Sequence, residues 1–234
     1  MTAAHADLPV LARAEAEASR PSCRLCGRPG LVAFATIRHQ TYWRCEGCEA
    51  ILLDETCLLS GADEHAYYGL HENDVHDPGY RAFVSRLGDP LLERLKPVSE
   101  GLDYGCGPGP ALAAILGEHG HRVSLYDPFF HPGTAVLDRS YDFIICCEVA
   151  EHFHRPGDEF ERLDALLRPG GWLGLMTCFR TDDRLFANWH YRHDPTHVVF
   201  YREQTLRSIA ARFGWSCAIP RKDVAIMRKP GAAA

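Results

Sequence analysis

The chain has 234 residues and a formal net charge of −6, from 25 Lys and Arg against 31 Asp and Glu. This length accommodates one full α/β domain and a small additional module. The acidic balance argues against broad nucleic-acid binding, which requires a basic face. Ten cysteines without a secretion signal predict a reducing, cytoplasmic location, and no apolar run reaches the length of a transmembrane helix.

Two C-x-x-C pairs follow an Ala- and Glu-rich N-terminal segment, residues 1–19, which we expect to be flexible. The pairs consist of Cys23, Cys26, Cys45 and Cys48. Their spacing predicts a structural zinc site in residues 20–55, a zinc ribbon with short strands at 31–36 and 40–44. Four thiolates leave no open coordination position, so a catalytic zinc is not expected. A redox-active dithiol pair or a disulfide is the alternative.

A strand followed by a glycine-rich turn is predicted at residues 102–110, which read LDYGCGPGP. Gly105, Gly107 and Gly109 allow positive φ and a close approach of the backbone to a ligand. The helix predicted after this turn would direct its N-terminal N–H groups at the same ligand. The carboxylate of Asp103, just before the turn, would repel a phosphate and attract a cationic or amine-bearing ligand. A tight strand-to-helix turn without a ligand is the alternative.

Further apolar runs predict an α/β sheet with helices between its strands. The run at 141–147, YDFIICC, is apolar almost throughout, as in a strand covered on both faces. The further predicted strands lie at 122–126, 141–147, 172–177, 215–219 and 224–228, and two predicted helices lie at 80–95 and 110–117. This pattern predicts one sheet domain at 98–230. Residues 56–97 form a linker and a covering helical segment.

Three segments together resemble the class I S-adenosylmethionine-dependent methyltransferases. They are the G-x-G-x-G turn after Asp103, the E-V-x-E-H segment from Glu148 to His152, and the R-P-G-G turn at 168–171. The resemblance covers the sheet domain and implies a Rossmann-like, doubly wound sheet with an antiparallel edge strand. It implies S-adenosylmethionine as the cofactor, with Asp103 near its methionine part and Asp127 accepting the ribose hydroxyls. The cofactor-binding residues that it implies are Asp103, Tyr104, Gly105, Cys106, Gly107, Gly109, Asp127, Pro128 and Glu148.

One segment departs from the family pattern. Only 13 residues lie between Asp127 and Tyr141, which is too short for the usual helix, third strand and loop. The acidic residue that the family places against the adenine therefore has one candidate, Asp138. An exposed turn residue is the alternative reading of Asp138.

The segment before the sheet domain is polar and aromatic. In related methyltransferases the corresponding region often covers the cofactor and the substrate. The candidates for such a lid are Tyr67, Tyr68, His71 and Asn73. An ordinary capped loop is the alternative.

The segment at 189–197, WHYRHDPTH, follows the last parallel strand and forms the most unusual polar cluster of the chain. Loops at the carboxyl ends of parallel strands carry ligand sites, and a hydroxyl or protonated amine acceptor needs a base. The candidate catalytic residues are His152, His193 and His197. Packed, hydrogen-bonded histidines are the alternative. A metal site on His190, His193 and His197 is disfavoured, because Pro195 interrupts the helix that their spacing needs.

The combined motifs predict a methyltransferase acting on the oxygen, nitrogen or carbon of a small metabolite, with no membrane partner. One alternative is an rRNA methyltransferase that uses the zinc ribbon to hold RNA. Five arginines lie in or beside the ribbon, and nearby acidic residues offset their charge. The arginines are Arg20, Arg24, Arg28, Arg38 and Arg44. A second alternative is an interaction module that binds S-adenosylmethionine without catalysis.

Overall fold

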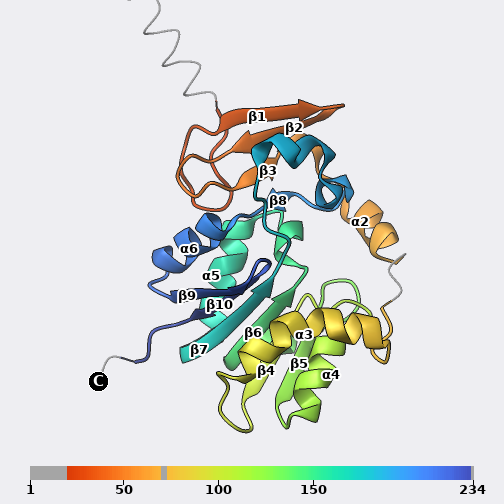
Figure 1. Cartoon of the computed structure of the whole chain (residues 1–234), viewed down its shortest axis with the longest axis vertical. Helices are drawn as coiled ribbons and strands as arrows, with labels where there is room; N and C mark the ends of the chain where they lie inside the picture. The colour runs from red at the N-terminus through yellow and green to blue at the C-terminus, as the bar shows by residue number, and fades with distance from the viewer. Residues whose placement is uncertain (1–19, 70–72, 233–234) are drawn as a thin grey trace, which may run out of the picture.

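The computed structural model describes residues 20–69 and 73–232, which form two β-sheets with helices around them (Figure 1). The segment predicted to be flexible, residues 1–19, lies outside the described residues. Within the described ranges, no helix combines the length and the apolar character that a membrane crossing requires.

The larger sheet has the strand order β5-β4-β6-β7-β10-β9. Its parallel strands are β4 (Glu100–Tyr104), β5 (Arg122–Tyr126), β6 (Tyr141–Cys147) and β7 (Leu167–Met176). At one edge, β10 (Val224–Arg228) runs antiparallel to both of its neighbours, β7 and β9 (Ser216–Arg221). This sheet confirms the predicted Rossmann-like α/β fold with an antiparallel edge.

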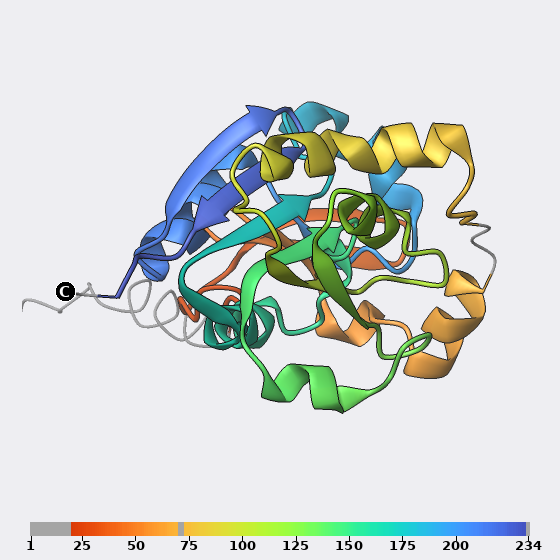
Figure 2. The ribbon, with the colours of Figure 1, turned by 90° about the horizontal axis from the view of Figure 1, so that it is seen from below.

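Helices cover both faces of this sheet, as Figure 2 shows from below. They are α3 (Pro78–Leu92), α4 (Ala111–Glu118), α5 (Pro156–Leu166) and α6 (Glu203–Arg212). Alternate residues of β6 point to opposite faces. Phe143 and Ile145 belong to the core beneath α3 and α4, whereas Ile144 and Cys146 belong to the core beneath α5 and α6. The nearly continuous apolar sequence of β6 follows from this burial on both faces.

The helix α3 begins two residues before the predicted start, residue 80, and ends three residues before the predicted end, residue 95. The carboxylate of Asp77 caps its N-terminus by accepting the N–H of Tyr80 at 2.5 Å, and Pro78 occupies the first turn. Residues 93 and 94 form only a turn, and the N–H of Leu95 donates to the carbonyl of Leu92. Apolar spacing thus located the helix, whereas its capping residue set the start.

The smaller sheet contains the two predicted ribbon strands, a third N-terminal strand that was not predicted, and one strand from a distant part of the chain. Its order is β1-β2-β3-β8, with all pairs antiparallel. The strands are β1 (Val32–Ile37), β2 (Gln40–Arg44), β3 (Ile51–Leu53) and β8 (Val199–Phe200). Because β8 follows the polar segment 189–197, the sheet joins the N-terminal module to that segment.

The first cysteine pair packs directly onto the larger domain. The side chain of Leu25, between the two cysteines, is buried. The N–H of Gly157 in α5 donates to the carbonyl of Arg24 at 2.9 Å, and the guanidinium of Arg212 in α6 donates to the carbonyl of Leu25 at 2.9 Å. A Cβ on Gly157 would lie 2.8 Å from the Arg24 carbonyl oxygen. Residues 20–55 therefore share one core with the sheet domain.

Short elements connect the strands and the main helices. They are α2 (Gly61–Tyr68), which the sequence did not predict, and the 3₁₀ helices η1 (Glu55–Cys57), η2 (Thr134–Asp138), η3 (Ala150–His152), η4 (Asp183–Asn188) and η5 (His190–His193). Between β5 and β6 the described chain forms only η2 and a two-residue bridge of Asp127 with His131. The third strand is absent there, as the short spacing predicted, so β5 is an edge of the sheet. The turn predicted at 168–171 is included in β7, which carries a register irregularity near its start.

Candidate active site

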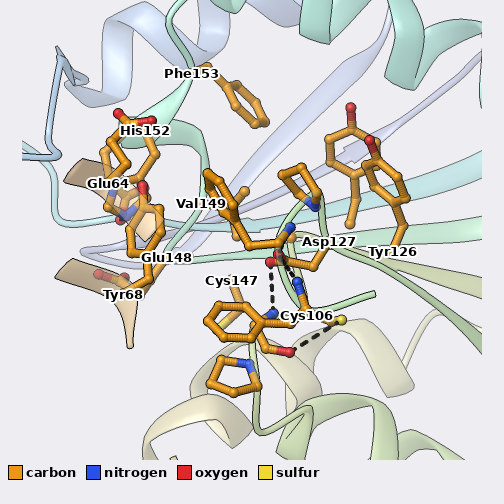
Figure 3. Close-up of a pocket in the computed structure, with 18 of the residues that line it drawn as sticks. Glu64, Tyr68, Cys106, Tyr126, Asp127, Cys147, Glu148, Val149, His152 and Phe153 are labelled. Atoms are coloured by element: carbon orange, nitrogen blue, oxygen red, sulfur yellow. Dashed lines mark hydrogen bonds and ion pairs between the residues drawn. The ribbon is translucent and has the colours of Figure 1, made fainter. Parts of the chain in front are cut away.

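A cavity of about 630 Å³ lies beyond the carboxyl ends of β4, β5 and β6. The segments that follow these strands supply much of its lining (Figure 3). Asp127 and Cys106 lie at one end, Tyr68 and His152 lie at the other, and Val149 lies between them. The lining residues from the predicted set are Tyr104, Gly105, Cys106, Gly107, Asp127, Pro128, Glu148, His152 and His197. Asp103, Gly109 and His193 are not among the lining residues.

The glycine turn needs its glycines for different reasons. Gly105 and Gly107 have φ values of +83° and +61°, in the left-handed region that favours glycine. A Cβ on Gly105 would lie 2.4 Å from a methyl group of Val149. Gly109 is outside the cavity lining, and a Cβ there would lie 2.0 Å from the carbonyl oxygen of Asn73. The turn thus allows Val149 and the segment before α3 to pack close to the backbone.

Asp127 is fixed by backbone donors. One carboxylate oxygen accepts the N–H groups of Phe129 (2.9 Å) and Phe130 (3.1 Å), and the other accepts the N–H of Gly107 at 3.0 Å. Asp103 is 3% exposed, and burial, followed by the negative charge of Asp127, raises its pKa to about 7. The adenine candidate, Asp138, is exposed and does not line the cavity.

The opposite end of the cavity holds two carboxyl groups that share one tyrosine hydroxyl. The hydroxyl of Tyr191 lies 3.0 Å from Oε2 of Glu148 and also in hydrogen-bonding contact with Oε1 of Glu151. It lies 2.9 Å from the hydroxyl of Thr177. A phenol carries one proton and can donate it to only one carboxylate at a time. Burial raises the pKa of both glutamates, and the charge of Glu151 raises that of Glu148 further.

Two of the three predicted histidines join these carboxyl groups. Nδ1 of His152 lies 3.1 Å from the carbonyl of Thr196, and Nδ1 of His197 lies 2.6 Å from the carbonyl of Tyr191. A carbonyl only accepts, so both rings carry hydrogen on Nδ1, and in the neutral form of each ring Nε2 is the nitrogen with the lone pair. The ring centroids are 4.7 Å apart. His193 is exposed, so the predicted trio does not converge.

Sequence reasoning missed Glu151, Tyr191 and Thr177 as residues of this cluster. Glu151 stands three residues after Glu148, and this spacing after a buried strand was a usable signal. Tyr191 and Thr177 gave no sequence signal, because their contact with the glutamates depends on the tertiary arrangement of η5 and the end of β7.

Two of the four lid candidates line the cavity. Tyr68 and Asn73 line it, and the ring of Tyr68 lies 5.3 Å from that of His152. Tyr67 is not among the lining residues. His71 lies outside the described residues.

The four cysteines of the ribbon converge. The sulfur atoms of Cys23 and Cys48 are 3.7 Å apart, and those of Cys26 and Cys45 are 3.5 Å apart. All four lie within 4.8 Å of one another. A tetrahedral zinc ion with Zn–S bonds of about 2.3 Å sets sulfur separations of about 3.8 Å. The donor set and its spacing therefore fit zinc without a large rearrangement.

Comparisons with known proteins address the fold and the family. A family model described as "Methyltransferase domain" matches residues 77–218, whereas a search of curated proteins found no match. One similar solved structure is the Haloferax volcanii complex of the Trm112 methyltransferase activator with a protein described as a methyltransferase. It is 15% identical over 71% of this chain and 97% of that chain, with a TM-score of 0.51.

Two enzyme structures with bound S-adenosylhomocysteine show a looser likeness. The N-methyltransferase NodS of Bradyrhizobium japonicum WM9 is 15% identical, covering 72% of this chain and 97% of its own, with a TM-score of 0.49. The 1,6-didemethyltoxoflavin-N1-methyltransferase of Burkholderia thailandensis is 16% identical, covering 85% and 99%, with a TM-score of 0.46. The family match spans more than half of the chain. The chain therefore belongs to the methyltransferase domain family, as a class I S-adenosylmethionine-dependent methyltransferase.

Proposed function

We propose that this methyltransferase acts on a small metabolite and that a hydroxyl oxygen is the methyl acceptor. One observation carries the proposal: a single cavity joins the glycine turn and Asp127 to a cluster of carboxyl and imidazole groups. Its volume of about 630 Å³ falls in the range of roughly 300–1,000 Å³ that small-molecule sites occupy. The aromatic lining suits a small ring or chain.

The end of the cavity near Asp127 would hold S-adenosylmethionine, which supplies an electrophilic methyl group on its sulfonium. Gly107, where a Cβ would meet nothing within 4 Å, leaves room for a ligand beside the turn. The Asp127 carboxylate is oriented in advance by its backbone donors, which suits recognition of the ribose hydroxyls. Phe129 and Phe130 line the cavity here and offer aromatic faces for the adenine.

The other end would position the acceptor and take its proton. A hydroxyl oxygen that gains a methyl group must lose its hydrogen. Glu148, His152 and His197 all line this end and carry groups that accept protons. His193 is exposed on η5 and is left out of the proposed machinery. Positioning and exclusion of water supply most of the rate in such a transfer.

The four cysteines would hold a structural zinc ion. Its chemical contribution would be folding free energy for a module too small to be stable alone. Because Leu25 and the neighbouring carbonyls pack against α5 and α6, the zinc would also fix how the module sits on the catalytic domain.

The alternative of an rRNA substrate gains little support from the ribbon. Arg24 donates to the carbonyls of His154 and Leu53, and Arg44 pairs with Asp183. These two arginines are engaged within the chain, which reduces the basic surface left for RNA.

The first test is calorimetric titration of S-adenosylmethionine and S-adenosylhomocysteine into zinc-loaded protein. Saturable binding is expected. The affinity should fall at least tenfold in Asp127→Asn, because an NH₂ group, which donates hydrogen bonds, replaces one carboxylate oxygen. The matched control is Asp138→Asn, which changes an exposed acidic residue outside the cavity lining and should leave affinity unchanged. Absence of binding to the intact protein would refute the proposal.

The second test identifies the acceptor class. A cell extract is incubated with the protein and S-adenosylmethionine labelled on its methyl group, with and without nuclease. The proposal expects label in small molecules and no effect of nuclease. Label that disappears with nuclease would support the RNA alternative, and no labelled product in a protein that binds the cofactor would favour the non-catalytic module.

A further inference from the structure

We propose that Glu151, His152 and His197 form a binding site for a divalent transition-metal ion, which anchors an oxygen acceptor in the cavity. The inference deepens the proposed function and relies on it for the chemistry of the acceptor. The metal site itself is argued from the geometry of the three side chains and can be tested without any acceptor.

The three side chains are spaced for a common ion. A nitrogen of each ring and an oxygen of Glu151 all lie within 4.8 Å of one another, and Nε2 of His152 lies 4.0 Å from Oε1 of Glu151. Three atoms at most 4.8 Å apart have a common centre at most about 2.8 Å from each, so inward shifts of less than about 1 Å would give the metal–ligand distances of about 2.0–2.2 Å. Small side-chain shifts would complete the coordination.

The supporting contacts of both histidines match those of metal ligands. Each ring donates its Nδ1 hydrogen to a backbone carbonyl, Thr196 for His152 and Tyr191 for His197. Metal-binding histidines almost always donate the other ring N–H in this way, which fixes the tautomer and orients the ring. Both carbonyls belong to the segment 189–197, so that segment sets the ligand geometry.

Glu151 gives an independent sign of a missing ligand. Its residue exposure is 0% and it lines the cavity. One oxygen contacts the Tyr191 hydroxyl, but the other, Oε2, has no hydrogen-bond partner among the described residues. Leaving a buried polar atom unsatisfied costs about 1–3 kcal/mol. A cation bound at this oxygen would remove that cost.

The charges around the cluster also favour a cation. Glu148 and Asp194 line the same region, and Oδ2 of Asp194 lies 3.9 Å from Nε2 of His197. Arg162 is the one Arg or Lys among the described lining residues, and its charge interacts chiefly with Tyr104 and Glu159, away from the cluster. Several acidic groups therefore face the cluster without a neighbouring Arg or Lys in the lining.

The donor set indicates the class of metal and of acceptor. Two imidazoles and one carboxylate suit Mn²⁺, Fe²⁺ or Zn²⁺ better than Mg²⁺, which prefers oxygen ligands. Three protein ligands leave adjacent coordination positions open. An acceptor with two neighbouring oxygens, such as a catechol or another vicinal diol, would occupy them.

The methyl-transfer step balances with this ion in place. The bound cation lowers the pKa of the acceptor hydroxyl and keeps the neighbouring carboxyl group of Glu148 ionised, so that Glu148 accepts the proton. The resulting oxygen attacks the methyl carbon. The carbon–sulfur bond breaks and its electron pair stays on sulfur, giving S-adenosylhomocysteine and the methyl ether. In this arrangement His152 and His197 are ligands, and Glu148 is the proton acceptor.

The test uses Mn²⁺ alone, added to the zinc-loaded full chain, with free Mn²⁺ measured by electron paramagnetic resonance. One saturable site is expected, weakened at least tenfold in Glu151→Gln and in His197→Gln. The matched control, His193→Gln, removes an exposed histidine of the same segment and should leave affinity unchanged. Unaltered binding in both ligand variants, or no saturable binding to the wild-type chain, would overturn the proposal.

A second measurement needs no variant, so it tests the site even if the ligand variants fail to fold. Pulsed electron paramagnetic resonance of Mn²⁺ on the wild-type chain should show coupling to imidazole nitrogen, and its absence would overturn the site. Failure of the metal site is distinguishable from failure of the proposed function. S-adenosylhomocysteine binding without Mn²⁺ binding removes only the metal, whereas ligand-dependent Mn²⁺ binding without cofactor binding removes only the methyl-transfer assignment.

Discussion

The contact between α5 and the first cysteine pair can be broken with one methyl group. In Gly157→Ala the new Cβ would lie 2.8 Å from the carbonyl oxygen of Arg24 and 2.9 Å from that of Leu25. Both atoms belong to the backbone and cannot rotate away. The substitution would also weaken the bond from the Gly157 N–H to the Arg24 carbonyl.

The expected change in the free energy of unfolding has three contributions, two destabilising and one stabilising. Overpacking costs about 1–3 kcal/mol, and the weakened hydrogen bond costs about 1 kcal/mol. The higher helix propensity of alanine returns about 1 kcal/mol. The net loss is about 2 kcal/mol, which for a chain of this size lowers the melting temperature by about 4–8 °C.

The assay is thermal and urea unfolding of zinc-saturated protein, monitored by circular dichroism. Gly117→Ala serves as the matched control, because Gly117 lies in the helix α4 and a Cβ on it would meet nothing within 4 Å. That variant should be slightly more stable than wild type. A melting temperature of Gly157→Ala at or above that of wild type would refute the conclusion that this contact holds the module in place.

Three further predictions address the metal, the buried acid and the turn. Removal of zinc by a chelator, or Cys26→Ser, should lower the melting temperature by about 10 °C, since ligand at a thousand times its Kd contributes about 4 kcal/mol. The raised pKa of Asp103, about 7 against 3.8, means that the folded state holds its proton more tightly. The free energy of unfolding should therefore fall as pH rises from about 4 to 7, and Asp103→Asn should flatten this fall in urea titrations. Gly105→Ala should reduce calorimetric affinity for S-adenosylmethionine at least tenfold, because its Cβ meets Val149 and its φ is +83°.

Each of these predictions has an outcome that contradicts it. Equal melting temperatures with and without chelator would remove zinc from the folding of the ribbon. A pH profile identical in Asp103→Asn and wild type would show that Asp103 titrates normally. Gly133→Ala, where a Cβ meets nothing within 4 Å, is the control for Gly105→Ala, and equal affinity in both would show that the turn tolerates a side chain.

The strands of the larger sheet were predictable because each one carries a local signal. The run at 141–147 is apolar enough to be buried on both faces, and β5 and β10 occupy the predicted ranges without shifts. Helix ends were less predictable, since a cap such as Asp77 decides the first turn more than apolar spacing does. The two-residue strand β8 has no sequence signal at all, because its pairing with β3 depends on tertiary structure.

The candidate site was predictable where the motif is continuous in sequence. Gly105, Gly107 and Asp127 lie on neighbouring strand ends, so the parallel sheet brings them together. The cluster around Glu151 combines residues from η3, the end of β7 and η5, and contacts between such distant segments leave no local pattern. His193 and His197 belong to the same segment, but His193 is exposed and His197 is buried at the cavity. Residue type alone could not distinguish them.

The pairing of β3 with β8 also has a consequence for synthesis on the ribosome. The N-terminal sheet takes its last strand from Val199 and Phe200, so it cannot close until most of the chain has emerged. During translation the exposed edge of β3 is left without its partner, and such edges are prone to pair with other chains. The early cysteine pairs give the emerging module a means of becoming ordered before its last strand arrives.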